Sequence, residues 1–180
     1  RRLKKYVPEL LCLYRKLIKP TVWNTTVEAC DFLDKDSRII HVKDKTSSSR
    51  LSHLFNQGTV SGRILIVDGA ARDLVRGKIS EVEAETGQAD FADIIPTAAS
   101  NFQSRDYTIV YAVIGTGDVP KLPFFSLVTL RQAVRDLKAL GYKAAFAWIK
   151  KPAAVGVKPT KPAGGDQDEG EVIDPEDEAA

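Results

Sequence analysis

Residues 107–114 read YTIVYAVI, the most strand-like run in the chain. Strands with apolar side chains on both faces are typical of the covered interior of a sheet, so we expect this strand to be central. After a loop rich in Gly and Pro, Ser126 can cap a helix that ends at Gly141. A last strand is then predicted over residues 142–149. Two strands joined by a helix indicate a parallel pair with a right-handed crossover.

The sequence before this unit predicts a helix followed by a hairpin. Apolar side chains recur every three or four residues from Leu3 to Ile18, which favours a helix, with Pro8 in or near its first turn. Residues 25–33 are rich in Thr and Val and predict a strand. Turn-forming residues follow, and residues 38–43 predict a second strand, so the two strands form a hairpin.

Two helices are predicted between the hairpin and the central strand. The serines at 47–49 can cap a helix that reaches Gly58, and the helical spacing restarts over residues 59–76. Residues 77–104 are polar and interrupted by Gly and Pro, which favours an irregular insertion with at most a short helix. We therefore predict one α/β domain over residues 1–149, a mixed sheet flanked by helices.

Composition and charge limit the function classes. Of the 180 residues, 43% are hydrophobic and 28% are charged, as in ordinary globular domains. No apolar run is long enough to cross a membrane, and two cysteines without a C-x-x-C spacing favour a reducing compartment, for which we expect the cytoplasm. The chain contains no Met, so we expect it to be a piece of a longer parent protein.

The two ends of the chain differ in charge. Residues 166–180 contain eight acids and no base, and residues 150–180 are predicted to be a disordered acidic tail because they have few large apolar side chains. Residues 1–150 carry an excess of seven basic side chains. A basic body suits a polyanionic partner such as DNA or RNA.

Candidate site residues gather on the hairpin and on the helix after it. They are Asp31 near the end of the first strand, His41 and Lys43 on the second strand, and His53 and Gln57 on the helix. Side chains alternate across a strand, so His41 and Lys43 share one face. His53 and Gln57 are one helical turn apart and can face the same place.

An acid on one strand and x-K on its hairpin partner resemble restriction-endonuclease-like nucleases, which place an aspartate and (D/E)-x-K on adjacent strands. The resemblance implies a sandwich fold of that type, with Asp31 and His41 as ligands of Mg²⁺ or Mn²⁺. It also implies that Lys43 assists the attacking water, with Gln57 in an auxiliary role. Here His41 replaces the usual acid, and a histidine suits Mg²⁺ poorly. Glu28 and Glu9 are possible further ligands, although a regular strand would direct Glu28 away from Asp31.

A second resemblance covers most of residues 20–149. The phrases at 40–43, 49–58 and 122–130 are similar to the C-terminal half of a sporadically distributed bacterial family of uncharacterised proteins. This family resemblance implies no activity.

Two hypotheses of different classes follow. The first is a nucleic-acid-directed domain, either a divergent metal-dependent nuclease or an inactive DNA-binding relative, in a bacterial defence protein. The second is a non-catalytic protein-interaction or scaffold domain of a larger protein. The phenylalanines Phe124 and Phe125 are expected to pack in the core under either hypothesis, and the oligomeric state is left open.

Overall fold

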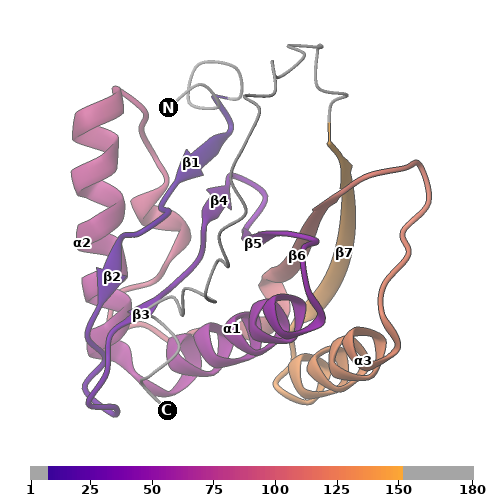
Figure 1. The fold of residues 1–180 in the computed structure, drawn as a ribbon. Coiled ribbons are helices and arrows are strands. Elements are labelled where there is room, and N and C mark those ends of the chain that lie inside the picture. The colour runs from indigo at the N-terminus through magenta and orange to yellow at the C-terminus, as the bar shows by residue number, and fades with distance from the viewer. Residues whose placement is uncertain (1–7, 152–180) are drawn as a thin grey trace, which may run out of the picture.

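The computed structural model describes residues 8–151 (Figure 1). The predicted acidic tail lies outside this range except for its first two residues, as does the first part of the predicted N-terminal helix.

A five-stranded mixed sheet forms the centre of the fold, in the order β1-β4-β5-β6-β7. The strands β5 (Arg38–Asp44), β6 (Thr108–Gly115) and β7 (Lys143–Lys150) are parallel. The short strands β4 (Phe32–Asp34) and β1 (Leu10–Cys12) extend the sheet in antiparallel pairing. The predicted α/β class with a mixed sheet is therefore confirmed, and β6 lies inside the sheet between β5 and β7.

Three helices flank the sheet, and their boundaries differ from the prediction. They are α1 (Ser48–Val67), α2 (Gly69–Thr86) and α3 (Phe124–Ala139), with short 3-10 turns η2 (Ala92–Ile94) and η3 (Ser104–Asp106). The helix predicted to end at Gly58 continues through it, because Gly58 packs closely against the sheet. The break comes at Asp68, whose side chain accepts a hydrogen bond from the Ala71 N–H and caps α2.

Two predicted segments are wrong. Residues 77–86 continue α2, so the irregular region begins only at Gly87. In place of a helix up to Ile18, the described residues form β1 and β2 (Leu17–Ile18). Leu11 and Leu13 are both buried, which is the alternation of a strand. Apolar residues in this segment fit both the three-to-four spacing of a helix and the alternation of a strand, which is why the sequence predicted a helix.

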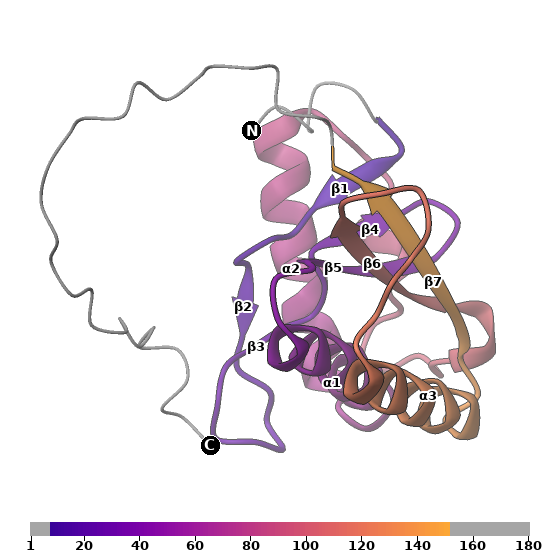
Figure 2. The same cartoon turned by 45° about the vertical axis from the view of Figure 1, so that its right-hand side comes forward.

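One hydrophobic core joins the three helices to a single face of the sheet. The side chains of Ile39, Ile109, Tyr111 and Val113 belong to it, together with buried residues of α1, α2 and α3. Figures 1 and 2 both show α1 and α3 side by side next to the parallel strands. The opposite face is also apolar, but its side chains do not belong to this core: Ile40, Val42, Val110 and Ala112.

Gly58 offers a test of this packing. A methyl group at Gly58 would overlap the ring and hydroxyl of Tyr111, which is fully buried and donates a hydrogen bond to the Phe55 carbonyl at 2.9 Å. We expect Gly58→Ala to lower the free energy of unfolding by about 2 kcal/mol, because overpacking outweighs the gain in helix propensity. Gly77 in α2 has open space around it, so Gly77→Ala should raise stability by roughly 0.5–1 kcal/mol. Urea denaturation measures both, and stabilisation by both changes would contradict the packing.

Candidate functional site

The site lies where a long hairpin bends. The strand β1 continues into β2, and β3 (Val27–Glu28) continues into β4, so the two segments form strand pairs at both ends, with a single backbone hydrogen bond from Leu13 to the Asp31 carbonyl between them. Arg15 in the bend has a positive φ of 61°, which is unusual for a residue other than glycine. On the other arm, residues 29–31 connect β3 to β4. Side chains at this interruption need not follow strand alternation.

Asp31 marks the point where β4 separates from β5. Its N–H still donates to the Ile40 carbonyl at 3.0 Å, whereas its carboxylate Oδ2 accepts the Val42 N–H at 2.6 Å. The carboxylate thus satisfies a backbone donor of β5 next to the strand pairing. Asp31 is only 8% exposed, and burial raises its pKa, opposed by the Val42 hydrogen bond and by the charge of Lys43.

Glu28 joins this charged group. It is half-buried, and its carboxylate accepts the backbone N–H of Arg15 across the bend. Burial raises the pKa of Glu28, the hydrogen bond from Arg15 opposes that shift, and the charge of Asp31 adds to it while Lys43 lowers it. Glu28, Asp31 and Lys43 are therefore electrostatically coupled. The expectation that Glu28 would point away from Asp31 assumed a regular strand, which the bend interrupts.

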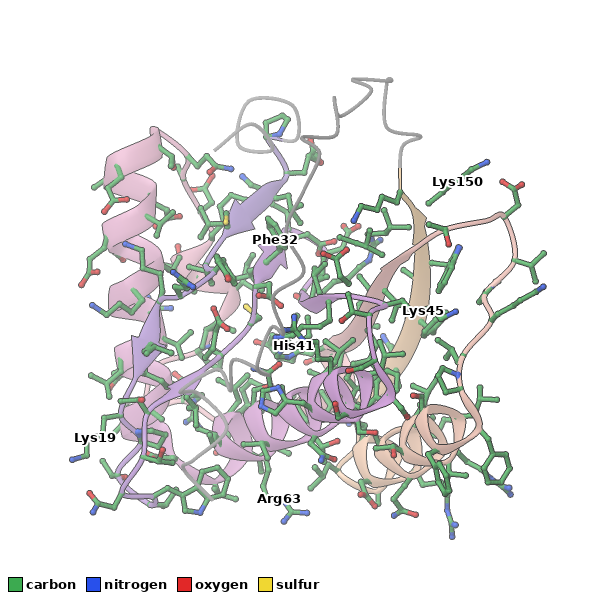
Figure 3. The ribbon with its side chains drawn as sticks, viewed as in Figure 1. Lys19, Phe32, His41, Lys45, Arg63 and Lys150 are labelled. Carbon is green, nitrogen blue, oxygen red and sulfur yellow. The ribbon has the colours of Figure 1, made fainter. Side chains whose placement is uncertain are left out.

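His41 occupies a different environment. It is 2% exposed, and its Nε2 lies 3.0 Å from the hydroxyl of Ser61 on α1. That hydroxyl donates to the Gly58 carbonyl, so it accepts the N–H of a neutral imidazole. Burial lowers the pKa of His41 to about 4. Figure 3 shows His41 between the sheet and α1, so the structure places it in the core and gives its ring a structural partner.

The two candidate residues on α1 lie in line with Ser61. Gln57 and His53 precede it by one and two turns, and Gln57 is half-buried whereas His53 is exposed. The helix α1 follows β5 after a short loop and packs against it. Gln57 and His53 lie nearer than Ser61 to the start of α1. Among the hydrogen bonds of residues 8–151, none joins the side chain of either residue to Asp31 or Lys43.

The comparison with protein families adds one finding. Residues 1–150 match the model of DUF6119, a family of unknown function. The chain belongs to this family. The match spans nearly all of the described DUF6119 domain and does not support the narrower expectation of a C-terminal half. No curated protein and no solved structure matches the chain.

The DUF6119 domain offers two carboxylates rather than a complete metal cage. Within residues 8–151, no three His, Cys, Asp or Glu side chains gather closely enough to hold a metal ion. Mg²⁺ commonly binds one or two carboxylates and completes its shell with water and phosphate oxygens. Glu28 and Asp31 fit that pattern, since each has one carboxylate hydrogen bond from a backbone N–H.

Other features of the DUF6119 domain set the limits of the site. A hollow between α1, α2 and the β2–β3 pair has no room for a water molecule, and it is lined almost wholly by apolar side chains: Ile18, Val27, Ala29, Ser61, Ile64, Leu65 and Val75. None of the helices in the described part of the chain has the length and apolar character to cross a bilayer.

The sequence pattern identified part of this group. It predicted Asp31 and Lys43, and the charge of Lys43 lowers the pKa of Asp31 although the two side chains form no ion pair. It missed the coupling of Glu28 and the role of Ser61 as the partner of His41. A serine on the buried side of a helix is a detectable pattern, whereas the bend at which the Glu28 carboxylate accepts the Arg15 N–H has no evident motif.

Proposed function

We propose that this domain acts on nucleic-acid phosphodiesters, with Asp31 and Glu28 as ligands of a divalent cation and Lys43 beside the phosphate. The proposal covers two forms, a divergent nuclease and an inactive relative that retains nucleic-acid binding. A restriction-endonuclease-like sandwich is part of the proposal, since Asp31 directly precedes β4 and Lys43 lies on β5, the strand that pairs with β4. His41 is replaced by Glu28 as the second ligand.

The coupling of Asp31, Glu28 and Lys43 carries the proposal. The charge of Asp31 raises the pKa of the half-buried Glu28, burial raises the pKa of Asp31, and groups with shifted pKa values concentrate at functional sites. A bound divalent cation would favour the charged form of both carboxylates. Lys43 and Arg15 offset part of the negative charge on Glu28, and a cation would offset more of it.

Each residue has a distinct chemical task. A hard cation on the two carboxylates would polarise the phosphodiester and lower the pKa of bound water. The ammonium group of Lys43 would stabilise negative charge that grows on the phosphate. Gln57, half-buried on α1, would orient the water through its side-chain amide. The basic excess of residues 1–150 favours the approach of a polyanion.

The test uses the purified chain with end-labelled single-stranded DNA, duplex DNA and RNA at low salt. Each substrate is incubated with Mg²⁺, with Mn²⁺ or with EDTA. Cleavage that requires the metal supports the nuclease form, and retarded migration without cleavage supports the inactive form. A chain that neither cleaves nor retards any of the three substrates would exclude both.

The second candidate is a scaffold domain, and the second apolar sheet face favours it. Parallel strands usually bury both faces, and on this face Ile40 and Val42 are only half-buried, although Val110 and Ala112 are buried. This candidate predicts that Asp31→Ala and Lys43→Ala leave the biological effect of the full-length protein unchanged. Loss of that effect in variants that remain folded would exclude it.

A further inference from the structure

The carboxyl ends of the parallel strands meet at one edge of the sheet. There the backbone N–H of Lys45 donates to the Ile114 carbonyl at 2.7 Å, and its ammonium lies 6.0 Å from the centre of the Trp148 ring. The Trp148 indole N–H donates to the Gly117 carbonyl at 3.0 Å. Figure 3 shows Lys45 and Lys150 on the same side of β7, with Lys150 at its end. Segments distant in sequence thus form one surface.

The first turn of α3 adds two exposed aromatic rings to this edge. Phe124 and Phe125 are 72% and 73% exposed, and their ring centres are 5.5 Å apart. The expectation that they pack in the core is therefore wrong. The hydroxyls of Ser48 and Ser126 lie 3.0 Å apart, which fixes the start of α3 beside the start of α1. We call this region the carboxyl-edge surface, defined by Lys45, Lys121, Phe124, Phe125, Trp148 and Lys150.

Apolar exposure of this extent marks a binding surface in a folded domain. Leu127 and Val128 next to the phenylalanines are 49% and 50% exposed, and Val119 in the preceding loop is 65% exposed. The charged residues around the same edge are mostly basic. The cations are Lys43, Lys45, Arg50, Lys121, Lys150 and Lys151, and the acids are Asp44, Asp118 and, next to Lys43, Asp31 and Glu28; Asp118 pairs with Lys150.

We infer that the carboxyl-edge surface binds single-stranded nucleic acid, with bases on Phe124 and Phe125 and phosphates along the lysines. The choice of nucleic acid rests on the proposed function. Aromatic rings among basic side chains are the usual means of binding single strands, because each base can stack and each phosphate needs a cation. A duplex hides its base faces, so exposed phenylalanines contribute little to duplex binding.

The carboxyl-edge surface continues into the candidate site. Lys43 and Lys45 lie two residues apart where β5 ends, so a strand bound along the lysines passes close to Asp31 and Glu28. The two regions can therefore be tested by different measurements. The carboxyl-edge surface sets affinity, and the acids set metal-dependent cleavage.

Fluorescence anisotropy with a labelled oligothymidine of about 20 nucleotides and EDTA in the buffer measures the affinity. We expect the double variant Phe124→Ala/Phe125→Ala to weaken binding by about tenfold or more, since two stacking contacts are lost. Lys45→Gln with Lys150→Gln should reduce the slope of log affinity against log salt by about 1.4. Thermal melts of every variant confirm that the domain is folded.

A matched control comes from Tyr14, another exposed aromatic residue, 56% exposed on the bent hairpin. Tyr14→Ala should bind as the unmodified chain does. If the double phenylalanine variant bound the oligonucleotide as tightly as the unmodified chain, the inference would be overturned. The same holds if the main effect of the double variant were to abolish self-association or binding to anionic phospholipid vesicles. Asp31→Asn separates the two proposals, because it should bind normally without cleaving. If the phenylalanine substitutions did not change binding and the unmodified chain still cleaved, the carboxyl-edge surface would be rejected and the proposed function would stand.

Discussion

Replacement of Asp31 by asparagine is expected to slow metal-dependent cleavage by about 100-fold or more while the domain stays folded. A carboxylate that holds a cation contributes several kcal/mol to the stabilisation of charge in the transition state. Loss of about 2.7 kcal/mol corresponds to 100-fold in rate. Single-turnover cleavage of a labelled oligonucleotide at saturating Mg²⁺ or Mn²⁺ provides the measurement.

The same substitution should leave stability unchanged or increase it. Asparagine retains an oxygen that can accept the Val42 N–H, which Asp31 accepts at 2.6 Å. It removes a charge that burial disfavours, as the raised pKa of Asp31 shows. A residue that costs stability and supports activity is typical of a functional site.

Asp44 at the end of β5 provides the matched control, because it is exposed. Asp44→Asn should keep cleavage within about twofold of the unmodified chain. If Asp31→Asn also cleaved within that range, Asp31 would have no role in the reaction. If Asp31→Asn unfolded the domain, its carboxylate would be structural.

The parallel part of the fold was predictable because its central strand is apolar on both faces and its neighbours have strand-like spacing. The run at 107–114 and the strand at 38–43 appear as β6 and β5. The N-terminal segment was not predictable by the same reasoning, because spacings of three or four residues and of two residues overlap over a short stretch. Tertiary pairing of Leu11 with Leu33 in the sheet decided in favour of a strand.

The sequence predicted which candidate residues share a face of β5, but not which face of the sheet is buried. Alternation placed His41 and Lys43 on one face of β5, but it does not say which face α1 covers. Ile39 shares that face and is 1% exposed, so the face is the core side. His41 is consequently buried, while Lys43 lies two residues further toward the strand end and is half-exposed.

The exposure of Phe124 and Phe125 shows a limit of composition-based reasoning. Large aromatic residues are buried in most domains. In α3, the buried side is formed by Ser126, Ala133 and Leu137, and small residues let α3 approach α1 closely. The phenylalanines fall on another side of the helix. When the buried side of a helix begins with a serine, as α3 does at Ser126, the aromatic residues next to that serine are expected to face solvent.

Mild acid is expected to destabilise the domain through His41. Its pKa is about 4 in the folded protein, because burial disfavours the imidazolium, compared with an ordinary value of 6.5. Between these values the unfolded chain binds more protons than the folded one. The free energy of unfolding therefore rises with pH over this window. The contribution of the neutral His41 is fully present above about pH 6.5 and is lost as the pH falls toward 4. The full difference is about 3 kcal/mol.

The chain contains two histidines, which allows a clean separation of this effect. His53 is exposed, so His53→Gln should leave the pH dependence of urea unfolding unchanged. His41→Gln removes the titrating group and should flatten the curve between pH 6.5 and 4, although the loss of fit against Ser61 lowers stability at every pH. A curve that keeps its slope in His41→Gln would assign the acid sensitivity to carboxylates instead. Asp31 and Glu28 have raised pKa values, so their protonation increases the free energy of unfolding as the pH falls, which is opposite to the effect of His41. The His41→Gln variant therefore shows the contribution of the histidine by itself.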